Sequence, residues 1–344
     1  MAEIEGKEAV GGVQLMADSA RPLLSVIVIG YKMPKQLAQT LYTLSTAYQQ
    51  GVTEQEYEVV VVENTSSEDF DESILPGLGG NFRFFRRDER SHTPVPAINF
   101  AFEQCRGQAI GLMIDGARMV TPRVIQYVLM SQRISPDSFT VVPGYHLGEQ
   151  GQHFNVSNGY DEEVEQQLLD STNWKDNGYE LFSIADISGA NPNGYLQPIM
   201  ECNCMFASAS SFERIGFADE RFTFRGGGAI NLHMFRSLGM LPASKLIVLP
   251  GEGSFHQFHG GVTTSEYDGL ERERASHRAQ LQELWGGEFH SLRREPVLFG
   301  AITPLAQDYL AFSVDRSKKR YKRFKARGDR LWEDDNQLAM EFRK

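Results

Sequence analysis

The sequence has few cysteines, no long apolar run and no recognisable targeting segment. Its 344 residues include three cysteines, Cys105, Cys202 and Cys204, and no second pair accompanies the last two to complete a zinc cage. No apolar stretch approaches the roughly 18 residues that a membrane-spanning helix needs, and the first residues lack the basic and apolar regions of a signal peptide. These absences argue against a structural zinc fold and lead us to expect a cytoplasmic protein.

An excess of positive charge is also missing. The chain has 34 Lys and Arg against 45 Asp and Glu, a net charge of -11, which disfavours nonspecific binding of its whole surface to nucleic acid or to an anionic bilayer. Residues 316–330 are the exception, with nine Lys or Arg, one acid and interleaved aromatics. This basic tail predicts a peripheral contact with the inner membrane surface or a solvated helix face. No nucleic acid partner is expected, because no reading module accompanies the patch.

The composition is that of a folded globular protein, with 41% hydrophobic and 23% charged residues. At about 150 residues per domain, the chain is long enough for one large or two modest domains. Residues 1–20 show no periodicity and little apolar content, so we expect a flexible leader there.

Apolar runs and helical patterns alternate along the first half of the chain. The runs that predict buried strands occupy residues 24–29, 57–62, 82–85 and 110–114. Apolar residues at helical spacing predict helices after Pro34, over residues 97–105 and from Val124. Strands that alternate with helices indicate right-handed crossovers, so we predict an α/β fold with a Rossmann-like, mostly parallel sheet flanked by helices.

The pattern changes between residues 144 and 200, where asparagines, glycines and aromatics are scattered. This composition predicts a long inserted loop region that binds a sugar or another hydroxyl-rich ligand, or an elaborate surface insertion. Regular patterns then return, and they predict strands at 202–207 and 245–249 and helices at 209–215 and 230–238. The last hundred residues are expected to be largely helical.

Several of these segments resemble family 2 glycosyltransferases, whose fold is the GT-A type. Residues 25–32 read Ser-Val-Ile-Val-Ile-Gly-Tyr-Lys, close to the family's Ser-Val-Ile-Ile-Pro followed by Thr-Tyr-Asn. Glu63 ends the second strand and Asp115 ends the fourth. Residues 215–222 resemble the family's Gly-Gly-Phe-Asp-Glu-x-Phe. The resemblance covers about residues 24–259 and implies a GT-A-like fold that binds a nucleotide sugar.

The resemblance places a nucleotide site at the carboxyl ends of the strands, where such a sheet forms a crevice. Glu63 would accept a hydrogen bond from the N3 hydrogen of uracil, or it is a solvated strand-end acid. Asp115 would contact the ribose or a metal-bound water. The residues expected at the nucleotide are Ile29, Gly30, Tyr31, Glu63, Asp115, Gly116, Ala117 and Arg118.

The Asp-x-Asp motif of the family is incomplete here. Residues 115–117 read Asp-Gly-Ala, and a methyl group cannot ligate a hard cation such as Mn²⁺ or Mg²⁺. The resemblance implies that a late loop brings a histidine toward the metal or the diphosphate, so Asp115, His256 and His259 are the candidate ligands of a divalent cation. The alternatives are that these histidines hydrogen-bond within their loop, and that Arg118 neutralises the diphosphate.

The acidic pair that supplies the family's general base is missing as well. The family's Glu-Asp-x-Asp-Leu aligns with residues 228–232, which read Gly-Ala-Ile-Asn-Leu. Displacement at an anomeric carbon by an alcohol benefits from a base within hydrogen-bond reach of the hydroxyl. Glu201 and Asp219 are the catalytic candidates, although Asp219 also has a structural interpretation, and Glu220 and His233 lie nearby in the sequence.

The sequence therefore predicts an inverting glycosyltransferase that moves a sugar from a nucleotide sugar, a UDP-sugar in the first instance, to a hydroxyl of a glycan, lipid-linked or small acceptor. Residues 21–143 would bind the nucleotide, residues 144–262 the acceptor, and residues 263–344 would form a helical extension. The two missing acids favour a second hypothesis, a noncatalytic module that binds a glycan or a protein. A nucleotidyltransferase is the third, although no Gly-rich triphosphate loop follows the first strand.

Overall fold

The computed structural model describes residues 22–89, 91–149, 159–189, 191–259, 267–286 and 291–333. The predicted leader at residues 1–20 lies outside the described residues. No helix in the described ranges is both long enough and apolar enough to cross a membrane.

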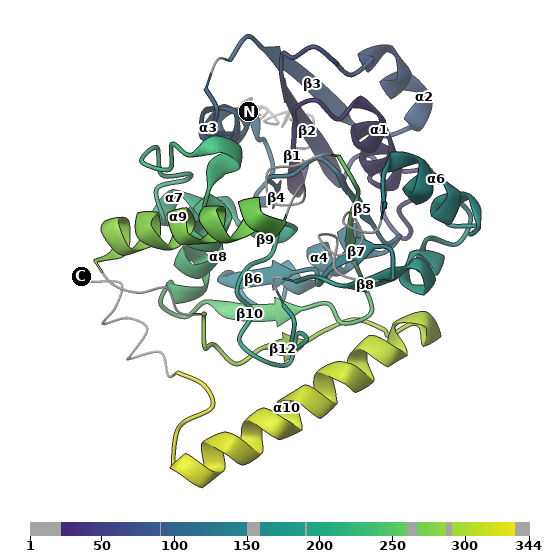
Figure 1. Ribbon diagram of the computed structural model, residues 1–344. Helices are drawn as coiled ribbons and strands as arrows, with labels where there is room; N and C mark the ends of the chain where they lie inside the picture. The colour runs from purple at the N-terminus through teal and green to yellow at the C-terminus, as the bar shows by residue number, and fades with distance from the viewer. Residues whose placement is uncertain are drawn as a thin grey trace, which may run out of the picture.

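An eight-stranded sheet lies at the centre of the molecule (Figure 1). Its strand order is β12-β10-β6-β9-β4-β1-β2-β3, and β9 runs antiparallel to β4 and β6 whereas the other neighbours pair in parallel. The strands are β1 (Leu24–Gly30), β2 (Tyr57–Asn64), β3 (Phe82–Arg87), β4 (Ala109–Met113), β6 (Ser138–Val141), β9 (Met205–Ser208), β10 (Lys245–Val248) and β12 (Val297–Leu298). The predicted α/β class with a mostly parallel sheet is confirmed.

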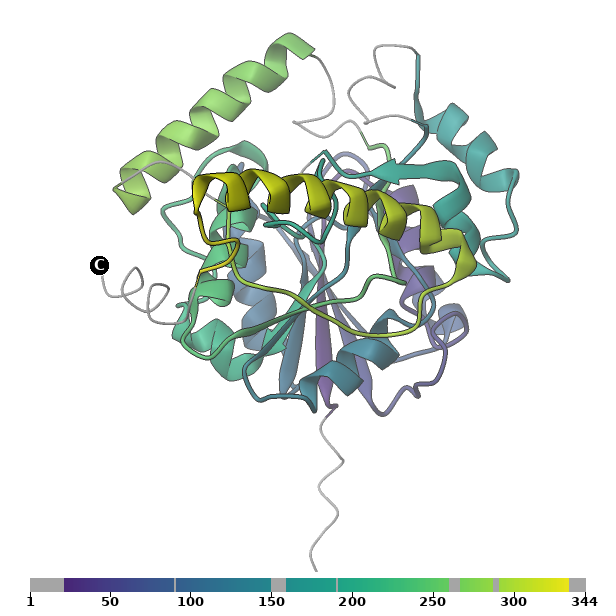
Figure 2. The ribbon, with the colours of Figure 1, turned by 90° about the horizontal axis from the view of Figure 1, so that it is seen from below.

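Helices cover both faces of this sheet (Figure 2), and every residue of β1 and β2 is accordingly buried. One face carries α1 (Pro34–Thr43) and α4 (Val124–Gln132). The segment that follows α1 contacts α4, where the Ile125 N–H donates to Gln49 Oε1 at 3.1 Å. The other face carries α3 (Val95–Gln104), α7 (Ala209–Arg214) and α8 (Ile230–Met240). On that side the rings of Phe102 and Phe212 lie 5.0 Å apart.

A second, four-stranded sheet connects two distant parts of the chain beside the first sheet. Its order is β5-β11-β7-β8, with β5 (Arg118–Val120), β11 (Ser254–His256), β7 (Gly144–Leu147) and β8 (Ala185–Ile187). The antiparallel register of β5 and β11 pairs Arg118 with His256. Because β5 begins three residues after Asp115, this pairing carries the late histidine segment to the end of β4.

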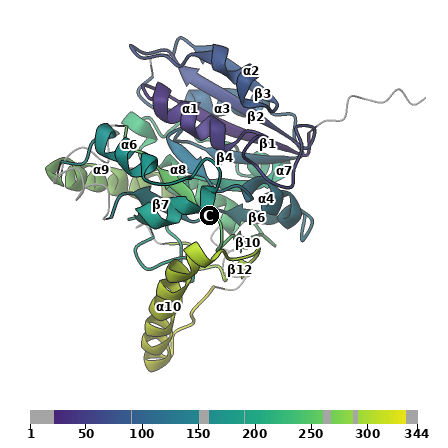
Figure 3. The same cartoon turned by 90° about the vertical axis from the view of Figure 1, so that its right-hand side faces the viewer.

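The remaining elements lie around these two sheets. They are η1 (Glu72–Ile74), α2 (Leu75–Leu78), α6 (Glu162–Asp170), η2 (Gly178–Ile184), η3 (Arg225–Gly227), α9 (Tyr267–Trp285), η4 (Pro304–Ala306) and α10 (Gln307–Arg327). The long helix α10 runs along the outer edge of the molecule (Figures 1 and 3). The helices α9 and α10 agree with the predicted helical C-terminal segment.

The predicted loop region at residues 144–200 holds more regular structure than its sequence indicates. It contains β7, α6, η2 and β8, although residues 150–158 and 190 lie outside the described ranges. Asp161 caps α6 by accepting hydrogen bonds from the N–H groups of Glu163 and Val164. Trp174 and Leu181 are buried in a second apolar cluster with Tyr48. Tertiary burial and one side-chain cap therefore order a segment that has no periodic apolar pattern.

Candidate nucleotide and metal site

Asp115 lies just beyond Ile114, the residue that follows β4, at the carboxyl edge of the parallel strands. Its side chain is 21% exposed, and its Oδ1 accepts a hydrogen bond from the Ala117 N–H at 3.0 Å. A Cβ added to Gly116 would stand 2.5 Å from the carbonyl oxygen of Ile29. Glycine at 116 thus allows the chain after β4 to pass close to the end of β1, and this approach fixes where the carboxylate projects.

Both predicted histidines meet this carboxylate. His256 Nε2 lies 2.7 Å from Asp115 Oδ2, and His259 Nε2 lies 3.6 Å from Asp115 Oδ1. The two Nε2 atoms are 3.2 Å apart. A third imidazole that the sequence analysis did not single out, His146 of β7, has its ring centre 5.6 Å from that of His256. The structure therefore brings together the three residues that were predicted as metal ligands.

The protonation states of His256 and Asp115 suit a bound cation, whereas, against the effect of burial, Asp115 raises the pKa of His259. Burial lowers the pKa of His256 to about 4, so its imidazole is neutral at pH 7. Burial acts to raise the pKa of Asp115, but the neighbouring His256 and His259 hold it well below its usual range. A neutral imidazole and an ionised carboxylate are the forms in which these groups bind metals.

The donor set fits a divalent transition metal. The ligand atoms of Asp115, His256 and His259 all lie within 4.8 Å of one another. Two imidazoles with one carboxylate suit a divalent transition metal ion, Mn²⁺ among them, better than Mg²⁺, which takes oxygen ligands. Three protein ligands also leave coordination positions for water or phosphate oxygens. Among the described residues, this cluster can therefore supply the metal ligands that Ala117, in the place of the family's second Asp, cannot.

Ala117 itself contributes through its backbone. Its methyl group is fully buried in the main apolar core. Its carbonyl oxygen accepts a hydrogen bond from the Gln257 N–H at 2.9 Å, next to the N–H group that supports Asp115. The residue thus links the carboxylate to the histidine segment without facing a ligand.

Side chains from two helices hold the histidine segment in place. Glu165 of α6 accepts a hydrogen bond from the Phe258 N–H at 2.7 Å through Oε2. Gln36 of α1 donates to the Phe258 carbonyl at 2.8 Å, and its own carbonyl accepts from the Gln257 side chain at 3.1 Å. Sequence reasoning missed Gln36 and Glu165, because no local pattern connects either one with residues 256–259.

Arg118 places a positive charge next to the cluster. Its side chain is buried, and its Nε lies 3.8 Å from Asp115 Oδ2. That Nε has no hydrogen-bond partner among the described residues. Because this Nε is enclosed by the protein, Arg118 acts on the site as a fixed positive charge next to the Asp115 carboxylate.

The other predicted nucleotide residues lie at the ends of β1 and β2. Ile29 and Gly30 are buried, whereas Tyr31 is half exposed. Glu63 is fully buried, its Oε1 accepting from the Phe70 N–H at 2.9 Å and its Oε2 pairing with Arg86 at 3.3 Å. Both carboxylate oxygens therefore already have partners, and Glu63 has the contacts of a structural ion pair.

The two predicted catalytic acids lie in different surroundings. Glu201 is half-buried, and its Oε2 accepts a hydrogen bond from Asn231 Nδ2 at 2.8 Å. Asp219 pairs with the exposed Arg221 at 2.6 Å, and this contact lowers the pKa of its carboxyl. The contacts of Asp219 match its structural interpretation.

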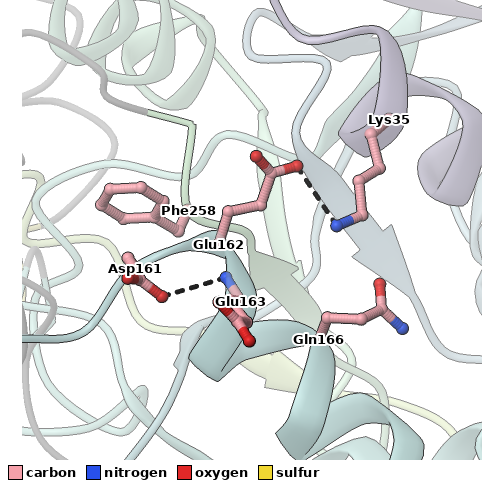
Figure 4. A pocket seen from close by; sticks show the side chains of 6 residues that line it. All are labelled: Lys35, Asp161, Glu162, Glu163, Gln166 and Phe258. Carbon is pink, nitrogen blue, oxygen red and sulfur yellow. Dashed lines mark hydrogen bonds and ion pairs between the residues drawn. The ribbon is translucent and has the colours of Figure 1, made fainter.

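An open depression of about 490 Å³ lies beside the histidine segment (Figure 4). Its lining residues are Lys35, Asp161, Glu162, Glu163, Gln166 and Phe258. Lys35 and Glu162 form an ion pair of 3.3 Å across it. Since Phe258 precedes His259, the depression borders the cluster on the side of α1 and α6.

The comparisons with known proteins agree with the motifs in the first half of the chain. Residues 25–151, a little over one third of the chain, match the model of glycosyl transferase family 2. No curated protein matches the chain.

Among solved structures, S. aureus TarS matches with 14% identity and a TM-score of 0.46 over 85% of this chain and 43% of that chain. This chain thus spans less than half the length of that structure. S. aureus TarS 1–349 in complex with UDP-GlcNAc matches with 13% identity and a TM-score of 0.46, covering 88% and 74% of the two chains. The same fragment in complex with UDP matches with 12% identity and a TM-score of 0.45, covering 90% and 93%.

The family match includes the opening strand, Glu63 and Asp115, which are the features that carried the resemblance. It confirms the resemblance over the matched segment. Residues 25–151 of this chain are therefore similar to family 2 glycosyltransferases.

Proposed function

We propose that this protein is a glycosyltransferase that uses a nucleotide sugar, a UDP-sugar in the first instance, and transfers the sugar with inversion to a hydroxyl of a glycan, lipid-linked or small acceptor. The cluster of Asp115, His256 and His259 at the carboxyl edge of the sheet is the observation that carries this proposal. The family match over residues 25–151 supports it.

In this proposal the chain's own residues divide the work. Asp115, His256 and His259 hold a divalent cation, Mn²⁺ in preference to Mg²⁺. When bound, the cation neutralises the charge that develops on the leaving diphosphate. Arg118 adds a second, fixed positive charge on the same side of the carboxylate. Residues 21–143 then hold the nucleotide and residues 144–262 the acceptor.

Calorimetry with UDP, UDP-GlcNAc and nucleoside triphosphates, in Mn²⁺, Mg²⁺ or chelator, tests this function. We expect UDP to bind in Mn²⁺ and to bind at least about 10-fold more weakly in chelator. Release of UDP from a UDP-sugar, followed in the same samples, reports turnover. Binding without turnover would favour the noncatalytic module, which the acid-free segment 228–232 also favours. A preference for triphosphates would favour the nucleotidyltransferase.

We also propose that a cytoplasmic form of the protein touches the inner membrane surface through residues 316–330. Lys318, Lys322 and Lys325 are exposed along one side of α10, and Tyr321 among them is 49% exposed. Each basic residue near an anionic bilayer contributes about 1 kcal/mol of attraction. A lipid-linked acceptor at that surface would then come within reach of the enzyme.

Sedimentation with phosphatidylglycerol vesicles tests this contact, with phosphatidylcholine vesicles as the reference. We expect binding to the anionic vesicles alone, and its loss in the triple variant Lys318→Glu, Lys322→Glu and Lys325→Glu. The matched control carries the same charge change at exposed positions outside α10, as Arg133→Glu, Lys175→Glu and Lys245→Glu. Equal binding by the two variants would contradict the contact.

A further inference from the structure

A general base is needed for the proposed reaction, and the first turn of α8 does not supply one. Residues 228–232 contain no acid, and Asn231 stands in that turn. Its side-chain amide is buried and donates the 2.8 Å hydrogen bond to Glu201. The carboxylate of Glu201, from a different part of the chain, therefore lies against the first turn of α8, which contains no acid.

The backbone around Glu201 is held in position. The Asn191 side chain donates to the Glu201 carbonyl oxygen at 3.1 Å, and its Oδ1 accepts from the Met200 N–H at 3.2 Å. Glu201 also lines a crevice of about 10 Å³ together with Gly144 and Asn191. A space of that size holds roughly one water molecule. The carboxylate is thus fixed beside a gap of the size of one hydroxyl group.

The hydrogen-bond pattern leaves one oxygen of Glu201 available. Oε2 accepts from Asn231, whereas Oε1 has no hydrogen-bond partner among the described residues. Asn231 suits this contact better than an aspartate, because an amide N–H stabilises the carboxylate and a second carboxylate would repel it.

Electrostatics connect Glu201 with the Asp115 cluster. Arg118 attracts the Glu201 carboxylate and also lies 3.8 Å from Asp115 Oδ2. Burial raises the pKa of Glu201, and both Asn231 and Arg118 oppose this rise. The Glu201 carboxylate in turn acts to raise the pKa of the neighbouring Cys202 thiol. A raised pKa brings a carboxylate closer to the range in which it accepts a proton efficiently at neutral pH.

Resting on the function proposed above, we propose that Glu201 is the general base of the transfer and that Asn231 is its positioning residue. Oε1 takes the proton of the acceptor hydroxyl while the hydroxyl oxygen forms its bond to the anomeric carbon. The bond from that carbon to the diphosphate oxygen breaks in the same step, and its electron pair leaves with UDP. Asn231 holds Oε2 so that Oε1 faces the acceptor.

The test follows UDP release from UDP-GlcNAc in Mn²⁺ together with the affinity for UDP. For Glu201→Gln we expect kcat to fall by about 100-fold or more while the Kd for UDP stays unchanged. The double variant Glu201→Gln and Asn231→Asp, which moves the acid onto α8, should recover at least a tenth of the lost activity. The matched control is Glu213→Gln, at an exposed position on α7, which should keep wild-type kcat.

The pH profile supplies a second measurement should Glu201→Gln not fold. Asn231→Ala removes the hydrogen bond that lowers the pKa of Glu201, so the acid limb of kcat should move to higher pH. A role of Asn231 in packing alone would lower activity without moving that limb. Wild-type kcat in Glu201→Gln, or an unmoved limb in Asn231→Ala, overturns the proposal.

Two further outcomes separate this inference from the proposed function. A wild-type protein that binds UDP but releases none from a nucleotide sugar overturns the base and leaves the nucleotide site standing. A wild-type protein that binds no nucleotide in any metal overturns the proposed function, and the base falls with it.

Discussion

Two acids at the ends of parallel strands, Glu63 and Asp115, have opposite environments. Glu63 is fully buried at the end of β2, and Arg86 and the Phe70 N–H occupy its oxygens. Asp115 follows β4 and faces His256 and His259, whose imidazoles can also bind a metal ion. Position at a strand end is therefore not enough to identify a ligand-binding acid. The partners decide, since both oxygens of Glu63 are occupied by a backbone N–H and a guanidinium, whereas Asp115 lies beside two imidazoles that can share a cation with it.

Removing the charge of Asp115 should have the largest effect on the site. In Asp115→Asn we expect Mn²⁺ to bind more than about 100-fold more weakly, because losing even an outer-shell partner of a metal costs 10–100-fold. The expected Mn²⁺-dependent binding of UDP should disappear with it. Calorimetry with Mn²⁺ alone measures this. Asp137→Asn, which removes an acid paired with Arg214 on the surface, is the control. Unchanged Mn²⁺ affinity would remove Asp115 from the site.

A third acid, Glu252, is buried, and its hydrogen-bond partners are hydroxyl groups rather than cations. Thr121 and Tyr179 donate to it at 2.5 and 2.9 Å, and burial raises its pKa from 4.5 to about 7. The folded state therefore keeps a proton that the unfolded state loses between these values, so stability should fall as pH rises through this window, by roughly 3 kcal/mol for this group. Above about pH 7 the loss should level off.

Glu252→Gln removes this ionisation. Urea unfolding at pH 4.5 and pH 8 should show that the variant loses less stability than the wild type as pH rises, again by roughly 3 kcal/mol. Glu165 also has a pKa raised to about 7 by burial, so a smaller pH dependence should remain in the variant. Identical pH dependence in the two proteins would show that ionisation of Glu252 does not cause the loss of stability.

The structural role of Glu63 is tested by removing the guanidinium of Arg86, its charged partner. Arg86→Met leaves a buried carboxylate without a charged partner and should cost about 2 kcal/mol of stability, a value below that for fully buried pairs because the guanidinium is partly exposed. If Glu63 serves the fold, the ratio of UDP to ADP affinity stays the same. A rise in this ratio, measured by calorimetry, would instead assign Glu63 to the uracil, as the sequence resemblance implies.

These differences also mark what the sequence could predict. The strands β1, β2 and β4 have continuous apolar runs, and a parallel sheet buried on both faces produces that pattern directly. The strands β5 and β11 have three residues each, and their pairing depends on partners far away in the chain. No local pattern could therefore predict the register that brings His256 to Asp115. The prediction that a late histidine approaches the metal or the diphosphate came from the family resemblance.

The same reasoning applies to the contacts of individual acids. The sequence placed both Glu63 and Asp115 at the nucleotide, because a strand end is visible in the sequence and the partner of a carboxylate is not. It named Glu201 as a candidate base from proximity alone. The contact with Asn231 needs the fold, since 30 residues separate the two. Glu165 carried no signal at all, because α6 lies in a segment without apolar periodicity.

The contact of Glu165 with the histidine segment gives the smallest expected effect. Its Oε2 accepts from the Phe258 N–H and from the Tyr160 hydroxyl, so Glu165→Leu should loosen residues 256–259 without removing a ligand of the cluster. We expect Mn²⁺ to bind about 10-fold more weakly, the lower end of the range for outer-shell residues. Glu165→Gln keeps an acceptor oxygen and should retain most of the affinity. Glu163→Leu, at an exposed position on the same helix, should leave Mn²⁺ binding unchanged. Equal losses in the two leucine variants would attribute the effect to α6 as a whole, whereas a loss confined to Glu165→Leu places the support of the site in that one carboxylate.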